Sequence, residues 1–573
     1  MQKTIKPLTK LKITLTLIIS VIIFASCVSS QLGKNDSGEF KNGMVVTAHP
    51  EASKVGIEIL KKGGNAVDAA VAVQFALAVV YPNAGNIGGG GFMVYRSAKG
   101  EVNALDFREK ASAAASRDMY LDAAGNPIVD KSLYGHLAAG VPGSVAGMVE
   151  AHQKYGKLSW KQVLQPAIDL AETGFEITKR QASELNGLHR RLMDININGT
   201  ALVNLESTWQ EKSLLVQTEL ANTLKLIQQK GKAGFYEGAV ADSIVAEMKR
   251  GNGLITKQDL KNYRAVWRKP IIGNYRDYKI ITMPPTSSGG IALIQLLQSV
   301  EPYPLKRWGH NADSTVQVVV EAERRVYADR ATHLGDPDFY KVPQNTPLNI
   351  NYNKKRMADF NWASATPSNQ ILAGVIKGKE SEETTHFSIV DHDGNAVSIT
   401  TTLNGSYGSF VVVKGGGFLL NNEMDDFSVK PGAPNMYGLV GGEANAIAPN
   451  KRMLSSMTPT IVEKEGKLFM VVGTPGGSTI ITSVFQTIIN VIDFDMNMQS
   501  AVAAKKFHHQ WLPDEVYIEK DAIDSLSTEK LKAKGYKLVY RGPIGRVDAI
   551  LKTKWGTLQA GADPRGDDTA IGY

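Results

Sequence analysis

The feature that most constrains the fold is a β-hairpin that begins where a polar stretch ends. Residues 361–383 are polar and loop-like, and they end in the run Glu-Ser-Glu-Glu. Residues 387–390 and 396–402 are rich in β-forming side chains. The residues between them, 391–395, read Asp-His-Asp-Gly-Asn, and an Asp-Gly step is a strong hairpin signal. The pattern predicts two antiparallel strands that directly follow a marked change in composition.

Helical blocks flank this hairpin and a second one. The second hairpin is predicted from residues 460–462 and 468–472, and it leads through a glycine-rich turn at 473–478 into a helix. We expect a further pair of strands within residues 271–283. Helices are predicted at residues 52–62, 66–80, 160–173, 291–300 and 479–492, and after Val141-Pro142-Gly143. Helices and hairpins in this order predict sheets stacked between layers of helices.

A glycine cluster at residues 85–91 precedes a short apolar run at 92–95. A dinucleotide-binding loop lies between a strand and a helix, whereas this cluster follows a helix and precedes a strand. We therefore expect a structural glycine turn close to a site.

Composition narrows the class of protein. The chain has 573 residues, 43% of them apolar and 21% charged, which is typical of a globular protein with a large core. The net charge of +8 is spread along the chain with both signs mixed, which favours a solvated surface over nucleic-acid binding. The pair His508-His509 lacks the spacing of metal ligands on a helix and is interpreted as packing. No metal site is expected.

The N-terminus has the form of an export signal. Four lysines precede an apolar segment at residues 13–24, which is short for a membrane span. The sequence Phe24-Ala25-Ser26-Cys27 then resembles a lipoprotein lipobox, and Cys27 is the single cysteine of the chain. The alternative is a plain secretory signal that contains a cysteine. We predict a lipoprotein signal at residues 1–27, lipid on Cys27, a polar tether at 28–40, and a membrane-anchored protein of the cell envelope or periplasm.

Several segments together resemble the γ-glutamyltransferase family, and the match covers nearly the whole chain after the tether. Their number, order and spacing make coincidence implausible. The resemblance implies the N-terminal-nucleophile hydrolase fold, an α+β four-layer αββα sandwich, and no cofactor. The matching segments are residues 65–70, 86–92, 105–109, 384–388, 419–427, 454–457 and 474–478.

Thr384 matches the nucleophile of that family. From local sequence alone it would read as an ordinary threonine at the start of a strand. The resemblance implies self-cleavage between Glu383 and Thr384, which would leave a large subunit of residues 41–383 and a small catalytic subunit of residues 384–573. A threonine hydroxyl needs a base, and a new N-terminal amine with a pKa of about 8 can act as one.

The resemblance also assigns helpers to the nucleophile. Thr402 matches a second threonine that hydrogen-bonds it, and the hairpin would bring their two strands together. Gly476 and Gly477 match the oxyanion hole. Their position between a strand and a helix supports this role, because backbone N–H groups at a helix start point at negative charge.

A γ-glutamyl group ends in an amino-acid head with one negative and one positive group. The resemblance implies that the carboxylate is bound by Arg108, Ser455 and Ser456, and the ammonium by Asn404, Glu423 and Asp426. Some relatives carry glutamine where Glu423 stands, and an acid there also accepts hydrogen bonds. Residues 431–450, which include Tyr437, resemble a lid over the pocket.

The implied activity is γ-glutamyl transfer and glutathione hydrolysis through an ester on Thr384. Glutathione and related γ-glutamyl compounds would be donors, and water, amino acids or peptides would be acceptors. One alternative is an amidase of the same fold, such as a cephalosporin-type acylase or a polyglutamate depolymerase. Another is an inactive lipoprotein that uses the fold for binding. Arg108, the paired serines and the lid argue against the first alternative, and an intact Thr384 with a full set of site residues argues against the second.

Overall fold

The computed structural model describes residues 39–573 except 198, 372–383, 431, 434, 437, 438 and 440. Three predicted functional residues, Cys27, Glu383 and Tyr437, lie outside the described residues, as does the predicted signal peptide. Within the part of the chain that is described, no helix has both the length and the apolar character needed to cross a membrane.

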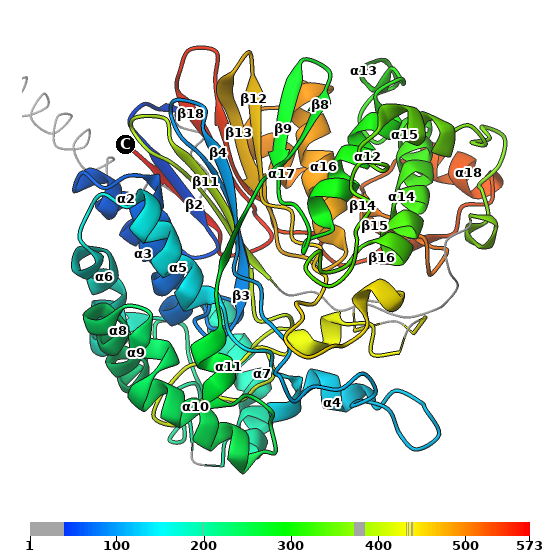
Figure 1. Ribbon diagram of the computed structural model, residues 1–573. Helices are drawn as coiled ribbons and strands as arrows, with labels where there is room; N and C mark the ends of the chain where they lie inside the picture. Colours follow the sequence, from blue (N-terminus) through cyan, green and yellow to red (C-terminus); the bar gives the residue numbers. More distant parts are fainter. Residues whose placement is uncertain are drawn as a thin grey trace, which may run out of the picture. The chain divides into compact units, whose positions relative to one another are not determined.

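Two antiparallel sheets of seven strands each form the centre of the molecule (Figure 1). The strands of the first sheet, in spatial order, are β1 (Glu39–Phe40), β18 (Leu558–Ala562), β17 (Asp548–Lys552), β13 (Lys467–Gly473), β12 (Thr460–Lys464), β9 (Tyr278–Thr282) and β8 (Ile271–Tyr275). Those of the second sheet are β19 (Thr569–Gly572), β2 (Met44–Thr47), β10 (Thr385–Val390), β11 (Ala396–Thr402), β3 (Gly90–Arg96), β4 (Val102–Asp106) and β7 (Val266–Arg268).

The two sheets stack face to face on a shared apolar core. Val46 and Phe92 of the second sheet pack with Ile461 and Ile550 of the first in one buried cluster. Burial of such side chains is the main favourable contribution to the stability of the sandwich.

One layer of helices covers the outer face of the second sheet (Figure 1). Helix α3 packs directly on β10 and β11. The helices on this side are α2 (Pro50–Lys61), α3 (Ala66–Val80), α5 (Ser144–Tyr155), α6 (Trp160–Thr173), α7 (Lys179–Ile195), α8 (Thr218–Lys230), α9 (Ala233–Tyr236), α10 (Gly238–Arg250) and α11 (Lys257–Asn262).

A second helical layer covers the outer face of the first sheet, where α12 packs on β8 and β9 and α16 packs on β13. Its helices are α12 (Gly289–Val300), α13 (Leu305–Trp308), α14 (Asp313–His333), α15 (Ile350–Arg356), α16 (Thr479–Ile492), α17 (Met498–Ala503) and α18 (Ser525–Ala533). The order helix, sheet, sheet, helix confirms the predicted α+β four-layer αββα sandwich.

Smaller elements complete the described chain. They are α4 (Val129–Leu133), the pair β5 (Phe175–Glu176) and β6 (Leu214–Leu215), the small sheet of β14 (Phe507–His508), β15 (Val516–Glu519) and β16 (Leu538–Arg541), and 3-10 turns at His136–Ala138, Ser368–Gln370, Glu423–Asp426 and Glu443–Asn445.

The predicted hairpin at Thr384 is confirmed as β10 and β11. Its register pairs Thr385 with Thr401. Alternate side chains face opposite ways, so that Phe387 packs toward the helices and Val390 toward the other sheet. Asp391 closes the turn, because its Oδ1 accepts hydrogen bonds from two backbone N–H groups of the turn at 3.0 and 2.9 Å.

Helix α3 has the boundaries that the sequence predicts. Asn65 Oδ1 accepts a hydrogen bond from the Asp68 N–H at 3.0 Å, and Asp68 Oδ2 accepts one from the Asn65 N–H at 3.0 Å. This reciprocal capping fixes the first turn. Every residue of the helix is buried, and its alanines permit the close packing on the sheet that their abundance predicts.

The expected glycine turn lies where backbones approach too closely for a side chain. A Cβ atom on Gly88 would lie 2.0 Å from the Leu419 carbonyl oxygen, and one on Gly89 would lie 2.0 Å from that of Thr402. Strand β3 starts at Gly90, two residues before the predicted start, because Gly90 and Gly91 pair with the end of β11. The glycine turn is in close contact with the end of β11 at Thr402 and with the segment that contains Leu419, so three segments distant in the sequence meet here.

The predicted tether at residues 28–40 is too long at its C-terminal end. Glu39 and Phe40 form strand β1, which pairs antiparallel with β18. Phe40 packs against the apolar core between the two sheets, and this contact recruits the two residues to the sheet edge.

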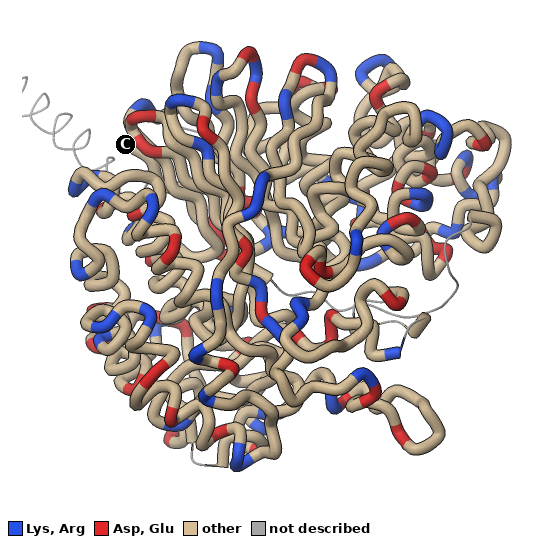
Figure 2. Tube along the Cα trace, in the orientation of Figure 1, with Lys and Arg blue, Asp and Glu red and all other residues tan. Residues whose placement is uncertain are grey.

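Lysine and arginine residues are interspersed with aspartate and glutamate over the described chain, as the mixed sequence predicts (Figure 2). His508 and His509 are both buried. His508 is hydrogen-bonded to Thr482 at 2.9 Å and to Gln510 at 3.0 Å, which agrees with their interpretation as packing residues.

Candidate active site

Thr384 immediately precedes β10 and lines a cavity. The hairpin register places it opposite Thr402, and the two Oγ1 atoms are 3.5 Å apart. Thr402 Oγ1 also accepts a hydrogen bond from the Asn404 N–H at 2.7 Å, which orients its side chain. The predicted pairing of the two threonines is therefore present in the structure.

Nine predicted site residues line this one cavity, although they come from segments far apart in the sequence. They are Arg108, Thr384, Thr402, Asn404, Glu423, Asp426, Ser455, Ser456 and Gly477. Asn435, Leu439 and Gly441, from the segment predicted as a lid, also line it. Gly476 does not line the cavity but directly precedes Gly477.

The two glycines lie between the end of β13 and the start of α16, as predicted. Their φ angles are +134° at Gly476 and +53° at Gly477, a region that side-chain-bearing residues rarely adopt. The Gly476 carbonyl oxygen accepts from the Thr479 N–H at 2.9 Å and so joins the turn to the helix. A helix start beside Thr384 offers backbone N–H groups and positive potential to a developing oxyanion.

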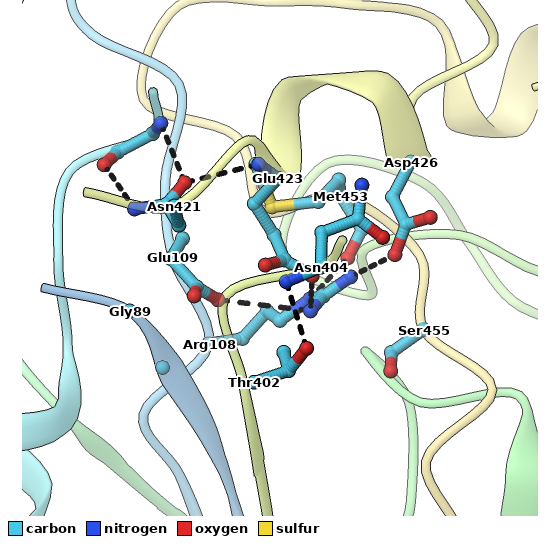
Figure 3. Close-up of polar contacts among 12 residues, drawn as sticks. Gly89, Arg108, Glu109, Thr402, Asn404, Asn421, Glu423, Asp426, Met453 and Ser455 are labelled. Atoms are coloured by element: carbon cyan, nitrogen blue, oxygen red, sulfur yellow. Dashed lines mark hydrogen bonds and ion pairs between the residues drawn. The ribbon is translucent and has the colours of Figure 1, made fainter. Parts of the chain in front are cut away.

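Arg108 follows β4 and is buried at the centre of a group of acids (Figure 3). Its guanidinium pairs with Glu423 and with Asp426, and Glu109 Oε2 lies 3.6 Å from its Nη1. Its Nε also donates to the Met453 carbonyl oxygen at 3.3 Å. Several carboxylates thus share one buried cation.

Burial strongly perturbs these acids. Burial raises the pKa of Glu109 to about 7, against the opposing effect of the Arg108 charge. Burial also raises the pKa of Glu423 and of Asp426, and again Arg108 opposes the shift. Perturbed titrating groups in a cavity are typical of functional sites.

The position of Glu423 is fixed by the asparagine two residues before it. Asn421 Oδ1 accepts hydrogen bonds from the Glu423 N–H at 3.0 Å and from the Gly140 N–H at 2.9 Å (Figure 3). Its Nδ2 donates to the Gly88 carbonyl oxygen at 2.8 Å, which belongs to the glycine turn. The turn therefore supports the acidic side of the cavity.

The predicted carboxylate and ammonium binders adjoin each other. An α-amino acid carries its two charges on one carbon atom, so a site for both must place cationic and anionic groups side by side. The contacts of Arg108 with Glu423 and Asp426 meet this requirement, and Ser455 lies on the neighbouring segment (Figure 3).

Two charged residues of the site, Glu109 and Arg330, lack a predicted role. Glu109 belongs to a matching segment, but nothing in its local sequence indicates burial beside Arg108. Arg330 of α14 lines the cavity and donates to Ser456 Oγ at 3.0 Å. Burial lowers the pKa of Arg330, although arginine keeps its charge at neutral pH.

No group of three or more His, Cys, Asp or Glu side chains among the described residues is arranged to hold a metal ion. The chemistry available in the cavity is that of a hydroxyl nucleophile, backbone N–H donors and paired opposite charges.

A four-layer αββα sandwich with a threonine at the start of a central strand, facing the cavity, defines the class of N-terminal-nucleophile hydrolases. Residues 52–573 match the family model described as gamma-glutamyltranspeptidase. The chain belongs to the γ-glutamyltranspeptidase family, which is a family of enzymes.

Two relatives illustrate the likeness in sequence. The chain is 48% identical to a glutathione hydrolase proenzyme of Escherichia coli over 536 residues, which cover 93% of this chain and 92% of that protein. It is 46% identical to a glutathione hydrolase proenzyme of Pseudomonas aeruginosa over 557 residues, with 96% and 97% covered.

Two solved structures illustrate the likeness in fold. A cephalosporin acylase from Bacillus halodurans superposes with a TM-score of 0.82 at 25% identity, over 95% of this chain and 98% of that chain. The γ-glutamyltranspeptidase of Helicobacter pylori superposes with a TM-score of 0.56 at 44% identity, over 60% of this chain and 97% of that chain.

Proposed function

We propose that this chain is a self-processing γ-glutamyltransferase and glutathione hydrolase in which Thr384 acts twice. The observation that carries the proposal is the placement of Thr384 beside Thr402 in a cavity that also holds Arg108, Glu423 and Asp426. The names of the relatives support glutathione as a donor substrate.

In the first reaction, Thr384 Oγ adds to the carbonyl carbon of Glu383. The peptide C–N bond then breaks, its nitrogen takes up a proton and becomes the α-amine of Thr384, and an ester links the two residues. Water hydrolyses this ester, so that Glu383 leaves as a carboxylate and Thr384 becomes an N-terminus.

In the second reaction, the new amine takes the proton of the Thr384 hydroxyl while Oγ attacks the γ-carbonyl carbon of a bound substrate. The backbone N–H groups near Gly477 stabilise the oxyanion, and Thr402 orients the nucleophile. The C–N bond to the leaving amine, such as that of cysteinylglycine, then breaks as this amine takes the proton from the Thr384 ammonium, and an ester forms on Thr384 Oγ. The γ-glutamyl group of this ester is transferred to water or to the amine of an amino acid or peptide, which frees the Thr384 hydroxyl.

The test is expression of the Thr384→Ala and Thr384→Ser variants beside the wild type. Wild type should give two chains on a denaturing gel and release glutamate from glutathione. Thr384→Ala should stay one chain and be inactive, whereas Thr384→Ser keeps a hydroxyl and should cleave and turn over slowly. A Thr384→Ala protein that splits at the same bond or hydrolyses glutathione would refute the mechanism.

An acylase activity is the competing function, because the fold is shared with a cephalosporin acylase. Asn404, Glu423 and Asp426, which line the cavity, favour a substrate with a free α-ammonium group, which a glutaryl group lacks. Parallel assays with glutathione and with a glutaryl amide of the same leaving group separate the two functions. A preference for the glutaryl amide would reverse the assignment.

We further propose that the protein is exported and held at a membrane of the cell envelope by lipid on Cys27. The support is the lipobox-like sequence, which lies outside the described residues. Cys27→Ser should abolish labelling by a radioactive fatty acid and move the protein to the soluble fraction, with glutathione hydrolysis retained. Equal membrane retention of the variant and wild type would rule out the anchor.

A further inference from the structure

One buried guanidinium in the cavity has no carboxylate partner within ion-pairing distance among the described residues. Arg330 is 5% exposed, and its Nε and Nη2 donate to two hydroxyl groups, Ser288 Oγ at 2.9 Å and Ser456 Oγ at 3.0 Å. Two other buried arginines of the same helix, Arg324 and Arg325, both form ion pairs with Glu321.

This difference within one helix is informative. Burying a charge without a counterion is costly, so buried charges in proteins are normally paired. Asp426 is the acid whose charge acts on Arg330 across the cavity, but its carboxylate is paired with Arg108. The charge of Arg330 is therefore directed at the cavity, where a negatively charged group of a substrate would balance it.

The hydrogen bonds of Arg330 also reach both serines of the predicted carboxylate site. Ser288 Oγ accepts from Arg330 and donates to the Ser455 carbonyl oxygen at 2.6 Å, while the Ser288 N–H donates to the same oxygen at 2.8 Å. Ser287 Oγ donates to the Met457 carbonyl oxygen at 2.6 Å. Ser287 and Ser288, whose sequence gave no functional clue, thus hydrogen-bond to the backbone of residues 455–457 and hold the segment of the two serines in place.

The bond to Ser456 has a directional consequence. A hydroxyl group has one proton to donate. Because Ser456 Oγ accepts from Arg330 Nη2, its own proton must point away from the guanidinium, and Ser456 lines the cavity. The guanidinium therefore leaves the proton of the Ser456 hydroxyl available to donate to a bound substrate.

We propose that Arg330 is a positioning residue for the α-carboxylate of the γ-glutamyl substrate, which it attracts by its charge and presents with the Ser456 proton. Arg108 already pairs with Glu423 and Asp426, which face the substrate ammonium. Arg330 therefore supplies a second positive charge, which balances the negative charge of the substrate carboxylate. This inference rests on the proposed function, because it assumes that the serines bind that carboxylate.

The test compares two substrates that differ in one group. L-γ-glutamyl-p-nitroanilide has the α-carboxylate, and its analogue carries a neutral carboxamide in that place. Arg330→Met should raise KM for the first substrate by about tenfold to a hundredfold, as loss of a charge-assisted contact would, and change kcat by less than about threefold. For the carboxamide, the variant and wild type should have kcat/KM values within about threefold of each other.

Three further variants sharpen the experiment. Arg330→Lys keeps the charge and should recover part of the affinity. The double variant Ser456→Ala/Arg330→Met should raise KM for the carboxylate substrate by less than the product of the two single-variant increases, because the two residues act together. Arg325→Met on the same buried helix is the matched control, and any effect it has should be equal for both substrates.

The outcomes separate the two hypotheses. A wild-type enzyme that hydrolyses neither substrate would refute the proposed function itself. If wild type is active but Arg330→Met loses equally on both substrates, or loses kcat with KM unchanged, Arg330 has no role toward the carboxylate. Failure of both Arg330 variants to fold, with Arg325→Met folded, would assign Arg330 to the structural core and overturn the inference.

Discussion

Replacing Arg108 by methionine tests how the cavity holds its charges. The side chain loses its guanidinium, and the buried acids Glu423 and Asp426 then lose the cation that pairs with them. Breaking a buried ion pair by removing one partner costs about 3–5 kcal/mol. That exceeds the roughly 1.5–3 kcal/mol of a single charge-assisted contact to a substrate carboxylate, which the sequence alone would suggest.

The acids can avoid part of this cost by taking up protons, and the sign of the pH dependence follows. Burial raises the pKa of Glu423 and Asp426 even with Arg108 present, and without it both values must rise further. Groups whose pKa is higher in the folded state contribute stability at low pH and lose it as pH rises. The stability deficit of Arg108→Met should therefore be larger at about pH 8 than at about pH 5.

Protonation limits the loss of stability but does not rescue catalysis, because protonated acids no longer attract the substrate ammonium. Loss of the charge-assisted contact to the substrate carboxylate, worth about 1.5–3 kcal/mol, corresponds at 1.36 kcal/mol per decade to a decrease in kcat/KM of roughly tenfold to somewhat over a hundredfold. Self-cleavage should continue, since no free glutamyl carboxylate takes part in it.

The assays are urea unfolding at the two pH values, kcat/KM for glutathione, and a denaturing gel. Arg190→Met is the control, because Arg190 pairs with Asp194 on the surface of α7 and both side chains are mostly exposed. Such a pair contributes about 0–1 kcal/mol. An Arg108→Met protein that unfolds like the control and keeps kcat/KM within about threefold would refute the reasoning.

Two other substitutions test separate parts of the structure. Thr402→Ala removes one neutral hydrogen bond to the nucleophile, worth about 0.5–1.5 kcal/mol, so processed enzyme should lose roughly two- to tenfold in kcat in initial-rate assays; an unchanged kcat would exclude the contact. Burial lowers the pKa of His386 from 6.5 to about 3, so the unfolded state binds the proton first and stability is lost as pH falls between these values. His386→Asn should therefore reduce the slope of unfolding free energy against pH by up to about 1.4 kcal/mol per unit at about pH 5, whereas the exposed His392→Asn should match wild type.

Features set by neighbouring residues could be predicted from the sequence. The boundaries of α3 follow from the Asn65 cap and the run of small apolar residues, and the hairpin of β10 and β11 follows from β-forming side chains around an Asp-Gly step. The cavity residues named from the family resemblance also meet, because that resemblance carries long-range information that local patterns lack.

The burial of Arg330 and of other charged residues on its helix could not be predicted from the sequence. Helix α14 contains Glu321, Glu323, Arg324 and Asp329, charges that read as a solvated surface, yet all of them are buried. Ion pairs and hydrogen bonds to other segments make this burial tolerable, and no local pattern encodes such partners. A polar helix inside the second helical layer is therefore indistinguishable from a surface helix until the fold is known.

The geometry of the nucleophile depends on strand register more than on any residue beside it. Thr384 faces Thr402 only because Thr385 pairs with Thr401, and a slip of one residue would turn every side chain of β10 to the opposite face. Such a slip is opposed on both sides, since Phe387 packs under the helices and Val390 packs between the sheets. At the C-terminal end of β11, beside the two threonines, the Gly89 backbone lies so close to the Thr402 carbonyl oxygen that a shift of either strand would require displacing the glycine turn. The burial of both faces of one hairpin thus sets the distance between the two hydroxyl groups.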